Sequence, residues 1–153
     1  MMWNKILVEC YNDETLFKAF NISKYDIEHN LDGKTEVLDK IENRNNCLAV
    51  IDNDKGTNHR YFNQANLIKI LTEDIKVFYE SNRNNYFLVF YPRLENVIER
   101  LVQNNERNIS TAENLGLKTD WKSLHNIGSN EDKLKKLKDL FIALINRSHA
   151  IKI

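Results

Sequence analysis

Three short apolar runs are spaced along the first third of the chain, each followed by polar residues. Residues 6–8 and 47–51 are continuous apolar runs, and the second is typical of a central parallel strand that is covered on both faces. Residues 24–29 show a weaker alternating pattern that predicts another short strand. The pattern therefore predicts three strands before residue 52.

Helical stripes of apolar residues separate these strands. The first stripe predicts a helix that Asn12 or Asp13 caps, with an apolar face made of Leu16, Phe17 and Phe20. The second stripe covers residues 35–43 and begins after Gly33 breaks the chain. Strand, helix, strand, helix and strand at these lengths indicate right-handed βαβ units and a parallel sheet.

The middle of the chain holds one clear strand and one clear helix. Residues 86–91 are a strong strand pattern, which Pro92 ends, and apolar positions then recur at helical spacing over residues 94–102. Before that strand, Leu67, Ile68 and Leu71 predict a helix. Residues 75–79 fit either a helix end or the partner strand of a hairpin.

The last third of the chain is mainly polar. Residues 104–130 carry little pattern, and Ser129 with Asp132 resembles a capping box for a last helix that runs to about Arg147. We expect an α/β domain with a mostly parallel sheet of about four strands flanked by helices, followed by a helical C-terminal region. Residues 1–103 would form the α/β core, and residues 104–153 a helical extension packed on the same domain.

Composition and charge narrow the function classes. The 22 basic and 22 acidic residues balance to a formal net charge of zero, which argues against binding a polyanion through overall charge. The balance leaves room for a metal-dependent enzyme, because a bound cation supplies its own positive charge. No apolar stretch approaches the length of a membrane helix, and neither cysteine has zinc-binding spacing, so we expect a cytoplasmic, reduced protein without a membrane partner.

Three carboxylates follow the two best early strands. Glu9 comes directly after residues 6–8, and Asp52 and Asp54 come directly after residues 47–51. Ligands of open α/β sheets bind at this carboxyl edge. Hard oxygen ligands in this arrangement suit Mg²⁺ or Mn²⁺, and the third carboxylate can handle a proton.

The order of these residues resembles that of the Toprim domain, the topoisomerase–primase fold. The matching positions are Glu9 after the first strand, Gly33 in the loop after the second strand, and the Asp-x-Asp of residues 52–54 on the third. Residues 92–98 are similar to the Arg-x-Ile-Glu-Asn motif of stand-alone Toprim nucleases of the OLD (overcoming lysogenization defect) type. The resemblance covers roughly residues 3–102.

The resemblance implies a Rossmann-like fold and a divalent-metal site that hydrolyses nucleic-acid phosphodiesters. By the family pattern, Asp52 and Asp54 bind Mg²⁺ (or Mn²⁺), and Glu9 acts as general acid/base or as a further ligand. Glu95 would complete a second metal site, so that two cations stabilise the attacking and leaving oxygens. Cys10 departs from the pattern, because the residue after the glutamate is usually glycine.

The resemblance also implies substrates and partners. DNA or RNA would be the substrate, phage defence the setting, and Lys55 and Arg93 lie near enough to the expected site to bind substrate phosphate. The ATPase module that accompanies OLD-type Toprim domains has no counterpart in this sequence, so either a separate ATPase or defence-system protein supplies it or this branch does without one.

Other interpretations stay open at this point. A carboxylate at a strand end is often a solvated residue or a helix cap, and Glu95 also fits a first-turn charge favoured by the helix dipole. The chain can instead be a non-catalytic interaction module that docks on an ATPase or toxin. The run 52–57 also resembles the nucleophile motif of haloacid-dehalogenase-type phosphatases. The four histidines are scattered, without the spacing of a known metal or catalytic motif. The lysines of the last helix are best interpreted as its solvent-exposed face.

Overall fold

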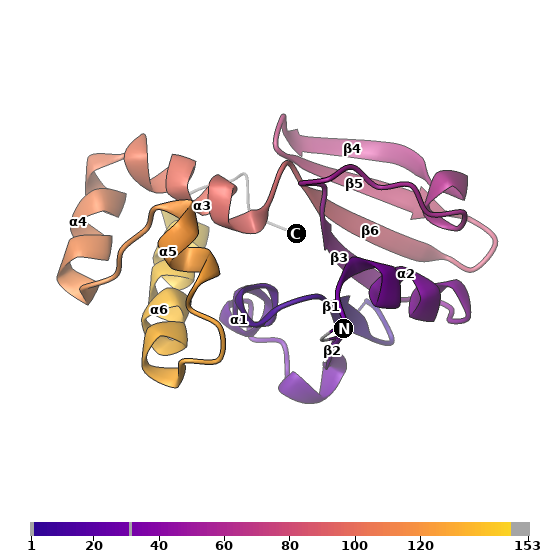
Figure 1. Ribbon diagram of the computed structural model, residues 1–153, viewed down its shortest axis with the longest axis horizontal. Helices are drawn as coiled ribbons and strands as arrows, with labels where there is room; N and C mark the ends of the chain where they lie inside the picture. Colours follow the sequence, from indigo (N-terminus) through magenta and orange to yellow (C-terminus); the bar gives the residue numbers. More distant parts are fainter. Residues whose placement is uncertain (1, 31, 148–153) are drawn as a thin grey trace.

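Four parallel strands in the spatial order β2-β1-β3-β6 form one side of a six-stranded sheet, and β5 and β4 extend it as an antiparallel hairpin (Figure 1). The computed structural model describes residues 2–30 and 32–147. The strands are β1 (Ile6–Val8), β2 (Ile27–His29), β3 (Leu48–Asp52), β4 (Asn66–Thr72), β5 (Ile75–Glu80) and β6 (Asn85–Phe90).

Eight helical segments accompany the strands within the described residues. The α-helices are α1 (Tyr11–Ala19), α2 (Lys34–Glu42), α3 (Leu94–Gln103), α4 (Glu106–Leu115), α5 (Trp121–His125) and α6 (Glu131–Arg147), and the short 3₁₀ turns are η1 (Lys24–Asp26) and η2 (Phe62–Gln64). The expected α/β fold with a mostly parallel sheet, flanking helices and a helical C-terminal region is confirmed. None of the described helices is both long enough and apolar enough to cross a bilayer.

The strand count was predicted too low. The sheet has six strands instead of about four, because residues 66–72, predicted as a helix, form β4. Their apolar spacing fits a helix, yet their backbone pairs with β5 across a tight turn. Leu67, Ile68 and Ile70 stay 47 to 58% exposed on this edge strand, so their pattern did not reflect burial.

Alternating side chains of the parallel strands build two hydrophobic clusters, one on each face of the sheet. Ile6 and Val8 of β1 belong to the cluster that α1, α3 and α6 cover, whereas Leu7 belongs to the cluster under α2. α6 packs against α1 and α4, so residues beyond 104 share the first cluster with the sheet. The last six residues of the expected C-terminal extension lie outside the described residues.

Two predicted caps differ from those observed. α1 begins at Tyr11 after Cys10, so Asn12 and Asp13 lie inside its first turn and both are buried. At the start of α6, the side chain of Asn130 accepts a hydrogen bond from the Lys133 N–H at 3.1 Å, which is the role expected of Ser129.

A buried asparagine ties the start of β6 to its neighbours. Asn85 is fully buried; its side-chain nitrogen donates to the carbonyls of Ile41 at 3.0 Å and Arg44 at 2.8 Å, and its oxygen accepts from the Cys47 N–H at 2.9 Å. These bonds satisfy backbone groups that water does not reach.

We expect Asn85→Ala to lower the free energy of unfolding by about 2 to 4 kcal/mol, because it leaves several buried backbone groups unpaired. In thermal denaturation this corresponds to a decrease in Tm of about 5 to 15 °C. Asn82→Ala, at an exposed position of the same β5–β6 turn, should leave Tm within about 2 °C of the wild type. Equal Tm values for both variants would contradict the role of Asn85.

Candidate functional site

Three carboxylates from separate elements are linked at the carboxyl edge of the parallel strands. Glu9 follows β1, Asp52 is the last residue of β3, and Glu95 lies in the first turn of α3. The backbone N–H of Asp52 donates to Glu9 Oε2 at 3.0 Å, and Asp52 Oδ1 accepts from the Leu94 N–H at 3.1 Å. The strand ends and the start of α3 thus hold these side chains in one place.

Asp13 is a fourth carboxylate that sequence reasoning assigned only as a helix cap. It lies in the first turn of α1, is 1% exposed, and no nitrogen or oxygen donor reaches its carboxylate oxygens, the Cys10 thiol being the donor beside them. One feature of the sequence could have indicated its place in the site: Asp13 follows Glu9 by four residues, in a helix that begins just after the strand end. Burial raises the pKa of Asp13 most, and the charges of Asp52, Glu9 and Glu95 raise it further, so Asp13 belongs to the same group as these carboxylates.

Glu95 is buried. The alternative interpretation of Glu95 as a solvated charge in the first turn of a helix does not describe this environment. Its side chain is 2% exposed; Oε1 accepts a hydrogen bond from Asn12 Nδ2 at 3.0 Å, and Oε2 has no partner. Asn12 also donates to the Leu124 carbonyl at 3.0 Å, so one amide connects α1, α3 and α5. We name Glu9, Asp13, Asp52 and Glu95 the carboxylate cluster.

Burial and mutual repulsion raise the proton affinity of Glu9, Asp13 and Asp52. Burial, with smaller contributions from the charges of Asp54 and Glu95, raises the pKa of Glu9 to about 7 against the hydrogen bond from Asp52. Burial and the charges of Glu95 and Glu9 raise the pKa of Asp52 to about 8. Burial, followed by the charge of Asp52, also raises the pKa of Asp13 well above its usual range. Such shifts are typical of sites that bind cations or transfer protons.

Asp54 lies at the rim, where two cationic side chains surround it. Arg93 donates from Nε at 3.2 Å and from Nη2 at 3.1 Å to Asp54 Oδ2, and Lys34 Nζ lies 4.0 Å from Oδ1. Lys34 also donates to the carbonyls of Asp52 at 2.9 Å and Gly56 at 2.8 Å. The Asp-x-Asp segment is therefore held by Lys34, while Lys55 is exposed to solvent.

Gly33 places Lys34 for this task. Its φ of +92° lies in a region that residues with a side chain rarely adopt, and it directly precedes α2. The loop that ends β2 can thereby turn sharply into a helix whose first residue reaches the end of β3.

The short helix α5 forms one wall of the site. His125 Nδ1 lies 3.6 Å from Glu95 Oε1, and its side chain is 61% exposed. The backbone N–H of Trp121 donates to Glu99 Oε2 at 2.8 Å, and the Arg93 guanidinium carbon lies 4.6 Å from the centre of the Trp121 ring. No sequence pattern connects residues 121–125 with the strand ends, because their own pattern is weak and they lie far away in the chain.

The donor set of the carboxylate cluster fits a hard divalent cation. Its ligands are carboxylate oxygens, and three oxygens of Asp13 and Glu95 are buried without any partner. Buried carboxylates without partners are costly unless a cation or proton compensates them. Asp13, Asp52 and Glu95 would hold the cation, and Glu9 beside them is available for a proton.

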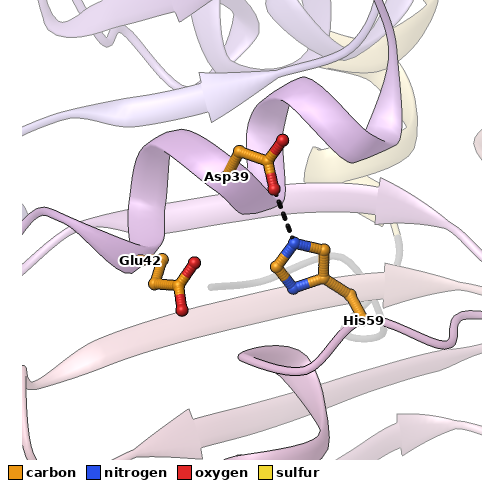
Figure 2. A group of neighbouring side chains, drawn as sticks. All are labelled: Asp39, Glu42 and His59. Carbon is orange, nitrogen blue, oxygen red and sulfur yellow. Dashed lines mark hydrogen bonds and ion pairs between the residues drawn. The ribbon is translucent and has the colours of Figure 1, made fainter.

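A second group of ligand types lies on the α2 face of the sheet (Figure 2). Asp39, Glu42 and His59 are the group, among the described residues, whose three ligand atoms all lie within 4.8 Å of one another. The atoms of the carboxylate cluster lie farther apart than this. Mg²⁺ usually keeps several of its waters, so carboxylates at this spacing would hold it partly through water molecules and not all by direct contact.

Existing interactions occupy the group of Asp39, Glu42 and His59. His59 Nδ1 accepts a hydrogen bond from the Tyr61 N–H at 3.1 Å, so its proton lies on Nε2, which donates to Asp39 at 2.8 Å. Glu42 accepts from Arg60 at 2.9 Å. A cation at Nε2 would have to displace that proton, whereas the cluster oxygens of Asp13 are unpaired.

No protein-family model, no curated protein and no solved structure matches the chain.

Proposed function

We propose that this chain is a divalent-metal-dependent hydrolase of nucleic-acid phosphodiesters, with Mg²⁺ or Mn²⁺ as its cation and DNA or RNA as its substrate. The observation that carries the proposal is the carboxylate cluster at the carboxyl edge of the sheet, with buried and unpartnered oxygens on Asp13 and Glu95. A site that concentrates negative charge in this way needs a cation before it can approach a phosphodiester.

Each residue has a role in this proposal. Asp13, Asp52 and Glu95 bind the cation, and Asp54 is a further ligand once Arg93 releases it. When bound, the cation would polarise the phosphodiester and lower the pKa of a water molecule. Glu9 accepts or donates a proton, since burial raises its pKa to about 7, close to neutral pH. Lys34 positions the segment that carries Asp52 and Asp54.

The order of Glu9, Gly33, Asp52-x-Asp54 and Glu95 supports a Toprim-type nuclease of the OLD class as the specific form of this proposal. In that form the protein works in phage defence with a separate ATPase or another defence-system protein, and Arg93 and Lys55 contact substrate phosphates. Cys10 stands where the pattern has glycine; its thiol stays protonated, because burial raises its pKa well above the usual range.

The decisive experiment compares cleavage of plasmid DNA, single-stranded DNA and RNA by the wild type and by Asp52→Ala plus Asp54→Ala. We expect cleavage with Mg²⁺ or Mn²⁺, no cleavage with EDTA, and none by the double variant. Activity that survives the double substitution would remove these residues from the mechanism. Hydrolysis of an aryl phosphate with no cleavage of nucleic acid would instead favour phosphatase chemistry.

One observation favours the alternative of a non-catalytic interaction module. The Arg93 guanidinium already satisfies one oxygen of Asp54 by two hydrogen bonds. A protein that never binds a cation there has reason to keep this ion pair, whereas a metal enzyme must open it.

Removing Arg93 separates the two functions. We expect Arg93→Gln to bind Mn²⁺ about 3- to 10-fold more tightly than the wild type in calorimetry, because Asp54 loses a competing cation. Arg44→Gln is the matched control, since Arg44 pairs with Glu28, which belongs to neither candidate cation group. Failure of both proteins to bind Mn²⁺ at millimolar concentration would favour the interaction module.

A further inference from the structure

A tryptophan and two cationic side chains stand beside the carboxylate cluster on α5 and α3. Trp121 is half-buried, the Arg93 guanidinium lies 4.6 Å from its ring centre, and Lys122 Nζ lies 5.8 Å from it. Arg93 at the same time contacts Asp54. Only one side chain therefore separates the indole ring from a candidate metal ligand.

Neighbouring contacts hold this wall in place. The backbone N–H of Trp121 donates to Glu99 on α3, and the backbone carbonyl of Leu124 accepts from Asn12 on α1. The Leu124 side chain is fully buried. Asn12 binds Glu95 through the same amide group, so α5 and the carboxylate cluster share a hydrogen-bonding residue. These bonds hold the backbone of α5 relative to the site, and the Arg93 guanidinium lies over the Trp121 ring.

We propose that Trp121, together with Arg93, stacks on an unpaired base of the nucleic-acid substrate, so that the site acts on single-stranded nucleic acid. The inference rests on the proposed function, and it adds the form of the substrate. An aromatic ring with adjacent cations is the combination that binds single strands, because every base offers a flat face and every linkage a phosphate. Arg93 contributes the guanidinium plane as well as charge.

Duplex nucleic acid offers no base for this stacking. Bases inside a duplex are already stacked and paired, and taking one out of the helix costs a few kcal/mol. The net charge of the whole chain is zero, so binding of a duplex by general attraction to phosphates cannot compensate this cost. Discrimination between single and double strands therefore follows from the Trp121–Arg93 pair.

The two tryptophans of the chain allow a direct test. Trp3 lies at the other end of the strands, where the centre of its ring is 6.1 Å from that of Tyr86. Because the chain has two tryptophans, Trp3→Phe leaves Trp121 as the sole one. We would titrate this variant, in Ca²⁺ to slow turnover, with a single-stranded oligonucleotide and with the same sequence closed into a hairpin duplex. The fluorescence of Trp121 should be quenched by the single strand at concentrations at least about 10-fold lower than by the duplex.

Substitution of the ring gives the second measurement, made by anisotropy of labelled oligonucleotides. We expect Trp121→Ala to weaken single-strand binding by about 10- to 100-fold, Trp121→Phe to retain most of it, and Trp3→Phe to match the wild type. Equal quenching by both oligonucleotides, or unchanged single-strand binding by Trp121→Ala, would overturn the inference.

Cleavage rates keep this inference separate from the proposed function. If the wild type cleaves single and double strands equally and Trp121→Ala changes neither rate, the inference fails while the hydrolase stands. If nothing is cleaved but the single strand quenches Trp121 selectively, the hydrolase fails while base stacking on α5 stands.

Discussion

Asp13→Asn should reduce metal-dependent cleavage by about 100-fold or more, which corresponds to about 2.7 kcal/mol of transition-state stabilisation. Both oxygens of Asp13 are buried and unpartnered beside Asp52 and Glu95, so an amide of the same size removes a negative charge that the cation needs. The same substitution should raise the Tm of the metal-free protein by several degrees, because it removes repulsion within the carboxylate cluster.

The matched control is Asp139→Asn, which changes an exposed aspartate on α6 in the same way. Its cleavage rate and metal-free Tm should equal those of the wild type. An Asp13→Asn protein that folds and cleaves at the wild-type rate would show that the carboxylate cluster does not include Asp13. A decrease in both Tm and activity would indicate a structural role instead.

The stability of the metal-free protein should increase as the pH falls from 8 to 6. The pKa of Glu9 is raised from 4.5 to about 7 and that of Asp52 from 3.8 to about 8, chiefly by burial. Between the unfolded and folded pKa values the folded state binds more protons than the unfolded state, so stability is lost as the pH rises through this window. We expect Tm at pH 6 to exceed Tm at pH 8 by about 5 to 10 °C.

Saturating Mg²⁺ or Mn²⁺ should reverse this trend, because the cation competes with protons for the same oxygens and binds best at pH 8. Asp52→Asn should flatten the metal-free curve, which assigns the trend to the carboxylate cluster. A metal-free Tm that stays constant or falls between pH 8 and pH 6 would contradict the electrostatic account of the site.

The parallel half of the sheet was predictable because its residues are buried on both faces. Residues 47–51 read as a central strand, and residues 48–52 form β3 between β1 and β6. The hairpin of β4 and β5 was not predictable in the same way. Leu67, Ile68 and Ile70 are exposed on the edge of the sheet, so backbone pairing determines their conformation and the apolar spacing misleads.

The candidate site was predictable only where it follows a strand. Glu9 and Asp52 could be placed at one edge of the sheet from strand order alone, because parallel strands end on the same side. Asp13 and the α5 wall come from helices, whose direction depends on tertiary packing. Trp121 reaches the site through Glu99 and Arg93, and no local pattern encodes such contacts over more than 20 residues.

The central claim is that the carboxylate cluster binds a divalent cation, and a crystal structure of the protein soaked in Mn²⁺ tests it most directly through the anomalous scattering of the metal. We predict an anomalous peak among Asp13, Asp52 and Glu95, bound by their oxygens directly or through water molecules, with Glu9 beside it. A peak at Asp39, Glu42 and His59 alone, or none at the carboxylate cluster at millimolar Mn²⁺, would contradict the claim.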